Sequence, residues 1–194
     1  IPASYETTLR ESFENILTKD EFNIFEKCVK DNIFTFQDAK VYETNETDQT
    51  VNTNLRKTET FPFFNLGVES MTVVFWANKL KNIFNNALKD YAKNTNTYID
   101  AKVNTIELLK YKVGGFFLQH TDHVTKIPRA ISFIYFLNDD YEGGDLIFRL
   151  PHGENLKINT KKNKLLVWPS NFLYPHEVTK VTKGIRYSIV AWAN

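Results

Sequence analysis

The sequence contains a single cysteine, no long apolar run and no excess of charge of either sign. Because Cys28 stands alone, neither an intramolecular disulfide nor a cysteine-based zinc cage can form. No stretch approaches the ~18 consecutive apolar residues of a membrane span. Lys+Arg 24 against Asp+Glu 23 gives a net charge of +1, which offers no general attraction to nucleic acid. The N-terminus shows no signal-peptide pattern, so we expect a soluble protein of the reducing cytoplasm, with neither membrane nor nucleic acid as partner.

Glycine is also scarce, whereas aromatic residues are abundant. The chain has Gly 7 but Phe 16 and Tyr 9, and its aromatic fraction is 14%. Aromatic and β-branched side chains favour strands and fill the space between packed layers. A length of 194 residues suits one core better than two. We therefore expect residues 1–194 to form one sheet-rich domain, whose oligomeric state the sequence leaves open.

The pattern of residues 1–96 predicts helices and a loop. Apolar residues recur at helical spacing in the first thirty positions, at Leu9, Phe13, Ile16, Leu17, Phe22, Phe25 and Val29. A second helix is predicted from Met71 to Ala92. The segment from Asn45 to Glu59 is polar and lacks periodicity, which predicts a surface loop or, alternatively, a mobile lid. We expect this part of the chain to give helical support beside a flexible loop.

The pattern changes after residue 97. Short runs rich in aromatic and β-branched residues lie between Gly, Pro, Asn or Asp, namely Phe116–Leu118, Ile131–Leu137, Leu146–Leu150, Leu165–Trp168 and Ile185–Trp192. Runs of this length without intervening helices are typical of antiparallel strands in a sandwich or jelly roll. The sequence thus predicts an α+β fold that is mainly β, with its helices near the N-terminus.

The four histidines draw attention to a possible metal site. His120 and Asp122 are two residues apart after a short apolar strand, so their side chains can face the same way. A second imidazole from a neighbouring strand would complete a facial triad of two histidines and one carboxylate, which is typical of non-haem Fe(II) oxygenases. The tripeptide alone has a simpler interpretation, a chance pattern on a solvated strand end. His123 should face away as a surface residue, and His152 should occupy a turn.

An arginine in the last strand-like run adds a second indication. Arg186 and Ser188 alternate with apolar neighbours, so they should share an internal face. A buried guanidinium without an anionic partner is costly, and no acidic residue lies close to it in the sequence. The carboxylate of a ligand would meet this need through a bidentate pair, with the Ser188 hydroxyl as a further donor.

These residues resemble those of a known family. The segment Tyr111–Asp122 reads YKVGGFFLQHTD and is similar to the Y-x-x-G-x-x-[FY]-x-x-H-x-D segment of prolyl 4-hydroxylases, which are 2-oxoglutarate- and Fe(II)-dependent dioxygenases. Further matches follow in family order: Leu137–Asn138, Tyr141–Asp145, Pro175–Val178 and Arg186. The resemblance covers roughly Leu109 to Trp192. It implies a double-stranded β-helix barrel of the jelly-roll or cupin-like type, with residues 97–194 as its catalytic half.

The resemblance also implies a role for individual residues. His120, Asp122 and His176 would be the iron ligands. Arg186 would bind the distal carboxylate of 2-oxoglutarate, with Tyr111 and Ser188 as further cosubstrate contacts. The required components would be Fe(II), 2-oxoglutarate and O2, with ascorbate as reductant. One position departs from the family pattern, since Phe136 stands where a tyrosine often assists the distal carboxylate; Ser132 is a candidate to help in its place.

The substrate implied by the resemblance is a peptidyl proline, carried by a protein or peptide. Arg129 and Trp192 stand at the spacing at which peptidyl prolyl hydroxylases carry an arginine beside the substrate and a tryptophan flanking the target proline. The same core serves many substrates, so a free amino acid or small metabolite is an alternative. A non-catalytic metal-binding scaffold is a third hypothesis, although it has no need for all four of His120, Asp122, His176 and Arg186.

Overall fold

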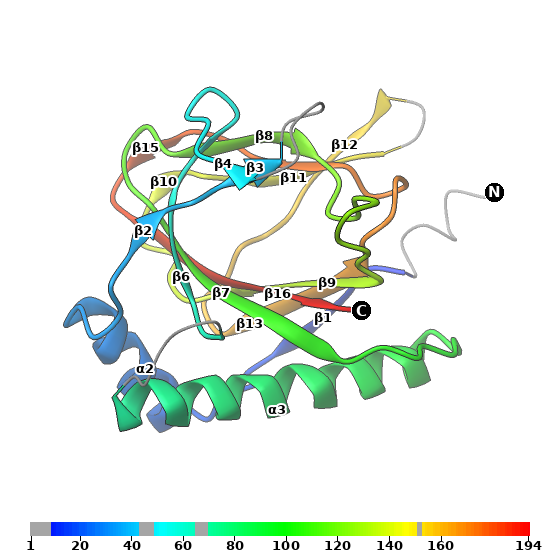
Figure 1. The fold of residues 1–194 in the computed structure, drawn as a ribbon, viewed down its shortest axis with the longest axis horizontal. Helices are drawn as coiled ribbons and strands as arrows, with labels where there is room; N and C mark the ends of the chain where they lie inside the picture. The colour runs from blue at the N-terminus through cyan, green and yellow to red at the C-terminus, as the bar shows by residue number, and fades with distance from the viewer. Residues whose placement is uncertain (1–8, 43–48, 65–69, 151–152) are drawn as a thin grey trace.

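The structure is a computed structural model, and it describes residues 9–42, 49–64, 70–150 and 153–194. Two facing antiparallel sheets form its centre (Figure 1). The larger sheet has the strand order β1 (Glu11–Glu14), β13 (Lys164–Pro169), β9 (Ile131–Phe136), β16 (Arg186–Ala193), β7 (Val103–Tyr111), β6 (Glu59–Pro62) and β2 (Gln37–Asp38). Every strand pair recorded in this sheet is antiparallel.

The smaller sheet closes the barrel opposite the first. Its order is β12 (Asn155–Lys157), β11 (Leu146–Arg149), β14 (His176–Val178), β8 (Phe116–His120) and β5 (Arg56–Lys57). Two short ribbons complete the described strands, β3 (Val41–Tyr42) with β4 (Gln49–Thr50) and β10 (Glu142–Gly143) with β15 (Val181–Lys183). This arrangement confirms the predicted jelly-roll type of fold, a mainly β barrel with two described helices.

Both helices pack against the outer face of the larger sheet. Figure 1 shows α3 (Met71–Asn94) running along this sheet with α2 (Lys19–Lys30) at one end. Helix α2 begins with a capping box, in which the Thr18 hydroxyl accepts from Glu21 N and the Glu21 carboxylate accepts from Thr18 N. Leu80 of α3 is completely buried in the resulting core. This core holds the helices to the sheet and contains no proposed site residue.

A second core fills the space between the two sheets. The side chains of a central strand such as β9 alternate between the two cores, because successive residues face opposite sides of a sheet. Tyr135 points to the helices, whereas Phe136 points into the barrel. The inner core consists of Leu109, Tyr111, Ile134, Phe136, Leu146, Phe148, Leu166, Trp168, Tyr174, Val178 and Val181. The candidate functional side chains lie against this inner core.

The expectations for the later strands and for the second helix are confirmed, with shifts of a few residues at their ends. The helix expected from Leu9 to Leu17 is wrong. Phe13 lies in β1, which pairs with β13 at the edge of the larger sheet, and helix begins only at Lys19. A strand of four residues is too short for its alternation to outweigh an apparent helical spacing.

The segment from Asn45 to Glu59 also differs from the expected loop. Residues 45–48 lie outside the described residues, but the remainder contributes β4 and β5 and the start of β6. Arg56 and Lys57 pair with β8, the strand that carries His120. The described part of residues 1–96 is therefore less helical than expected, because it also contributes strands to both sheets. The single domain of residues 1–194 stays a prediction.

Candidate metal centre and the chamber around it

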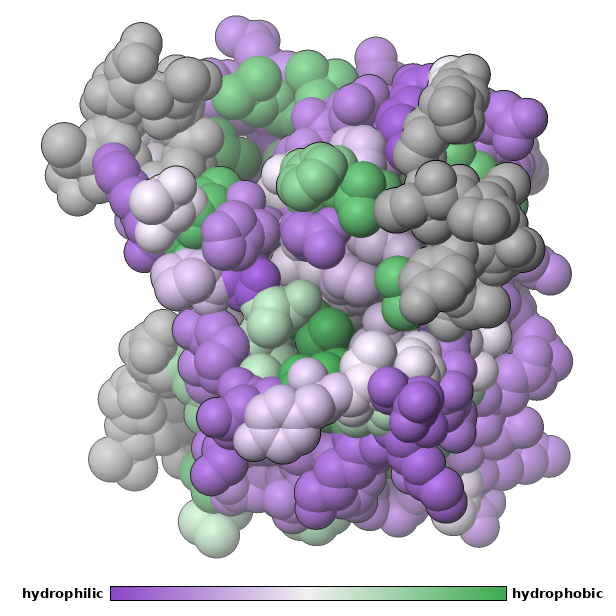
Figure 2. All heavy atoms as spheres, turned by 90° about the vertical axis from the view of Figure 1, so that its right-hand side faces the viewer, coloured by the Kyte–Doolittle hydropathy of each residue, from purple (hydrophilic) through white to green (hydrophobic). Residues whose placement is uncertain are grey.

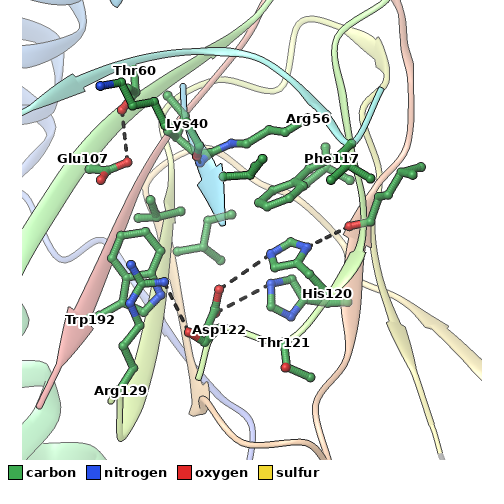
Figure 3. Close-up of a pocket in the computed structure, with 18 of the residues that line it drawn as sticks. Lys40, Arg56, Thr60, Glu107, Phe117, His120, Thr121, Asp122, Arg129 and Trp192 are labelled. Atoms are coloured by element: carbon green, nitrogen blue, oxygen red, sulfur yellow. Dashed lines mark hydrogen bonds and ion pairs between the residues drawn. The ribbon is translucent and has the colours of Figure 1, made fainter. Parts of the chain in front are cut away.

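Three side chains expected to bind metal meet inside the barrel. His120 ends β8, Asp122 follows two residues later, and His176 begins β14 directly opposite His120 in the strand register. Asp122 Oδ1 lies 3.6 Å from His120 Nε2, and Asp122 Oδ2 lies 3.7 Å from His176 Nε2. One potential ligand atom from each residue fits within a 4.8 Å group (Figure 3). The structure thus brings together the set that the sequence predicted.

The hydrogen bonds of the two imidazoles orient them for a cation. His120 Nδ1 lies 2.8 Å from Leu118 O, and His176 Nδ1 lies 3.0 Å from Tyr174 O. A carbonyl oxygen can only accept, so each Nδ1 carries a proton, and in the neutral imidazole Nε2 then presents a lone pair. Both lone pairs face a carboxylate, which is also an acceptor. Three acceptors that converge without a proton between them fit a metal ion.

The charge states of the triad also fit a metal ion. Burial lowers the pKa of His176 to about 4, with His120 adding to the effect and Asp122 opposing it. Burial would raise the pKa of Asp122, but the two imidazoles and the Ser132 hydroxyl outweigh it and hold this pKa well below its usual range. A neutral imidazole and an ionised carboxylate are the forms in which these groups bind metal.

Arg186 forms a second polar centre deeper in the barrel. It is fully buried, and its Nη1 donates to Ser188 Oγ over 2.9 Å. Within the described part of the chain, its Nε and Nη2 have no hydrogen-bond partner and no carboxylate pairs with it. The guanidinium carbon lies 5.1 Å from the ring centre of Tyr111 and 5.8 Å from that of Phe136. A buried cation with two unused donors fits an anionic ligand such as a carboxylate.

Gly144 leaves room for this arginine. A Cβ atom at Gly144 would stand 2.9 Å from Arg186 Cδ and 2.9 Å from Val181 Cγ2, closer than such atoms approach in proteins. Its φ of +62° also lies in the left-handed region that favours glycine. The glycine-rich turn before β11 is therefore part of the arginine's surroundings.

The expected role of Ser132 beside Arg186 is wrong. Its hydroxyl donates to Asp122 Oδ2 over 2.7 Å instead. Phe136 faces the barrel as expected, and the hydroxyl of Tyr135 bonds to Asn163 on the other side of the sheet. The arginine centre is thus built from Arg186 and Ser188 beside the phenol-bearing ring of Tyr111.

A chamber of about 650 Å³ extends from the triad toward solvent. Figure 2 views the end of the barrel at which β16 finishes, where hydrophobic atoms lie recessed within a largely hydrophilic rim. The chamber reaches Tyr111 at its inner part and Arg129 and Trp192 at its side. A volume of this size is typical of sites that enclose small molecules or single side chains.

Arg129 and Trp192 lie together, as the substrate hypothesis requires. The guanidinium carbon of Arg129 stands 3.7 Å from the ring centre of Trp192, and its Nη1 donates to Asp122 O over 3.3 Å (Figure 3). One face of the indole is therefore covered by the arginine. His123 contacts the Arg129 backbone through Nδ1 and lies outside the triad. His152 lies outside the described residues.

The opposite wall contains residues that the sequence analysis missed. The Phe117 ring stacks on the His120 ring, with 3.6 Å between ring centres and an angle of 18°. Arg56 of β5 lies over the Phe117 ring of this stack, with its guanidinium carbon 4.7 Å from the ring centre. Phe117 could have been identified from the sequence, because it belongs to the motif around His120. No sequence pattern could have identified Arg56, since only the pairing of β5 with β8 brings it to the chamber.

Comparisons with known proteins agree with this geometry. Residues 106–194 match the family model described as the 2OG-Fe(II) oxygenase superfamily. A PKHD-type hydroxylase of Rippkaea orientalis is 28% identical over 121 residues, which cover 59% of this chain and 53% of that protein. One from Thermosynechococcus vestitus is 34% identical over 104 residues, covering 49% and 45%. The chain thus spans about half the length of the curated relatives it matches.

Solved structures show the same fold over nearly the whole chain. A prolyl-4-hydroxylase of Pseudomonas putida superposes with a TM-score of 0.68 at 20% identity, covering 95% of this chain and 91% of that one. A prolyl hydroxylase of Trichoplax adhaerens, in complex with a peptide fragment of hypoxia inducible factor, gives 0.69 at 17% identity, covering 96% and 84%. Residues 106–194, which contain the triad, are thus similar to the 2OG-Fe(II) oxygenase superfamily, and the chain has the fold of these prolyl hydroxylase structures.

Proposed function

We propose that the protein is a 2-oxoglutarate- and Fe(II)-dependent dioxygenase that hydroxylates a peptidyl proline and releases succinate and CO2. The observation that carries the proposal is the pairing of two centres in one barrel. Three converging acceptors fit a metal ion, and the buried Arg186, packed against Tyr111 of the same chamber, fits an anion. A scaffold that only binds metal would not need the second centre.

In this proposal His120, Asp122 and His176 hold Fe(II), while Arg186, Ser188 and Tyr111 hold 2-oxoglutarate. Bound Fe(II) supplies the activation of O2 that drives decarboxylation of the cosubstrate and hydroxylation of a C–H bond, and ascorbate serves as reductant. Arg186 fixes the distal carboxylate through its two unused donors. The apolar floor of the chamber keeps water away from the reacting groups.

The substrate assignment rests on Arg129 and Trp192 at the side of the chamber. An indole face holds the rigid, apolar ring of proline at low entropic cost. The neighbouring guanidinium bonds backbone carbonyls, which are the polar groups that a proline keeps. A peptide substrate is also supported by the Trichoplax adhaerens protein, which is described in complex with a peptide.

A free amino acid or small metabolite is the second candidate. The chamber volume of about 650 Å³ favours it, because a small molecule fits such a space entirely. The two candidates differ in what must lie outside the chamber, since a peptide continues past the rim and a metabolite does not.

The deciding experiment is incubation with Fe(II), 2-oxoglutarate, ascorbate and a panel of proline-containing peptides and free amino acids. Mass spectrometry should detect one added oxygen atom on a proline peptide, with one succinate released per turnover. Asp122→Ala should abolish the product, and His123→Ala should retain it. If only a free amino acid is oxidised, the metabolite hypothesis replaces the peptidyl one. If 2-oxoglutarate is not consumed with any substrate, the dioxygenase proposal fails.

A further inference from the structure

Two buried serine hydroxyls extend from Asp122 in a chain of hydrogen bonds. Ser132 of β9 is fully buried, and Ser170, which follows β13, has an exposed fraction of 1%. Ser132 Oγ lies 2.7 Å from Asp122 Oδ2 and 2.7 Å from Ser170 Oγ. Both lengths are those of good O–H···O hydrogen bonds.

The number of protons fixes the direction of this chain. Each hydroxyl has one proton to donate, and an ionised carboxylate can only accept. Asp122 therefore uses the proton of Ser132. The contact between the serines must then be donated by Ser170, so the order is Ser170 to Ser132 to Asp122.

The backbone holds the outer end of this chain in place. Ser170 N donates to Ala130 O over 3.0 Å, and Ser170 O accepts from His123 N over 3.0 Å. Ser170 is thus tied both to the residue before β9 and to the residue after Asp122. The hydroxyl of Ser170 has little freedom to leave Ser132, because its own backbone is fixed on two sides.

We infer that Ser132 and Ser170 form a directional relay that positions the carboxylate of Asp122 for metal binding. Ser132 donates to Oδ2, which also lies 3.7 Å from His176 Nε2, while Oδ1 faces His120 Nε2 at 3.6 Å. Ser132 thereby keeps the carboxylate from turning and holds both of its oxygens toward the two imidazoles. The inference rests on the proposed function, since it requires a metal at the triad, and it makes both serines positioning residues.

The test measures Mn(II) affinity, with the metal alone as the probe, by titration against the electron paramagnetic resonance signal of free Mn(II). Ser132→Ala should weaken binding roughly 10- to 100-fold, the usual effect of removing a group that orients a metal ligand. Ser170→Ala should weaken it about 2- to 10-fold, because it removes a neutral hydrogen bond. The double variant should bind no more weakly than Ser132→Ala, since Ser170 acts only through Ser132. Ser132→Thr, which keeps a hydroxyl, should recover most of the affinity.

Tyr135→Phe is the matched control. It removes a buried hydroxyl from the same strand, where a hydrogen bond of equal length, 2.7 Å, points to the other side of the sheet. It should lower the unfolding temperature without changing Mn(II) affinity. The relay is overturned if Ser132→Ala binds Mn(II) as tightly as the wild type, if Tyr135→Phe loses as much affinity, or if the two serine effects add. A wild-type protein that binds no Mn(II) would overturn the proposed function and the relay with it.

Discussion

At the scale of single residues, Arg186 combines complete burial with a guanidinium that has donors to spare. Its one described hydrogen bond goes to Ser188, and aromatic rings line two of its sides. Without an anion, such a group pays the cost of leaving water and recovers little of it. In the proposed function, the side chain is already ordered before the cosubstrate binds, which lowers the free-energy cost of binding.

Replacing this arginine should separate cosubstrate binding from the other steps. We expect Arg186→Ala to raise the KM for 2-oxoglutarate roughly 10- to 100-fold, because hydrogen bonds to a charged group are lost inside the barrel. Lysine at this position should recover part of the affinity, because it restores the positive charge but lacks the planar guanidinium that pairs with a carboxylate through two donors. Steady-state kinetics at fixed peptide concentration measures the effect. An unchanged KM for 2-oxoglutarate in Arg186→Ala would show that the cosubstrate carboxylate binds elsewhere.

Gly144 should be as sensitive as the arginine that it borders. A methyl group there would stand 2.9 Å from Arg186 Cδ, so Gly144→Ala should displace the guanidinium and raise the 2-oxoglutarate KM about tenfold. Gly153→Ala is the control, since Gly153 also has a positive φ, +84°, but a Cβ there would meet nothing within 4 Å. Both variants carry backbone strain, and only the first should affect the cosubstrate. Equal KM values in the two would contradict this account.

The sequence predicts most of the candidate metal site at this scale, because the proposed ligands lie in short motifs. The spacing of His120 and Asp122 and the position of Arg186 in an alternating strand are both visible along the chain. The contact of Ser132 with Asp122 is not visible, since it depends on how β9 lies across from the segment after β8. Which of two inward-facing polar groups a serine meets is decided by packing.

At the scale of elements, the larger sheet separates two cores with different tasks. Its outer face carries α2 and α3, while its inner face borders the chamber opposite the smaller sheet, whose strands β8 and β14 hold His120 and His176. Predictions from sequence succeeded for elements long enough to show a period, such as α3 and β16. They failed for β1 and β5, which have four and two residues, because strands this short are defined by their partners.

Stability and metal binding should therefore respond to different residues. We expect Leu80→Ala in α3 to reduce the free energy of unfolding by about 2–5 kcal/mol, because it leaves a cavity at a fully buried position. The Mn(II) affinity of the folded variant should stay at the wild-type value. Urea unfolding and Mn(II) titration measure the two quantities. Asn82→Ala, at an exposed position of the same helix, should change stability by less than about 0.5 kcal/mol. A loss of metal affinity in Leu80→Ala would show that the sheet transmits changes between the cores.

At the scale of the whole molecule, metal binding should add to the stability of the fold, since the triad joins β8 to β14. A ligand that binds only the folded state stabilises it by about 2.7 kcal/mol at 100 times its Kd. We therefore expect Mn(II) at that excess to raise the unfolding temperature of the wild type and of His123→Ala. Asp122→Ala should show no increase, because one of three ligands is gone. Thermal unfolding with and without a chelator provides the measurement, and an equal increase in Asp122→Ala would place the metal at another site.

The rim of the chamber gives the last prediction. Arg129→Ala and Trp192→Ala should reduce peptide hydroxylation while Mn(II) affinity and 2-oxoglutarate binding stay close to wild type. Trp192→Phe should be milder, because it keeps an aromatic face beside the guanidinium. Cosubstrate decarboxylation in the absence of peptide should persist in all three. If peptide turnover is unaffected by both alanine variants, the proline does not bind against this wall.

The wall formed by Arg56 has a consequence for how such proteins diverge. Arg56 lies outside the matched segment 106–194, yet it covers the ring that stacks on a proposed metal ligand. In the proposed function, the matched segment thus supplies the reacting groups, and an earlier segment supplies one wall of the chamber. Substitutions before residue 106 can change which molecules the chamber admits while the proposed reaction stays the same. On this proposal, a change in the two-residue strand β5 would be enough to alter the substrate, while the proposed metal and cosubstrate residues stay the same.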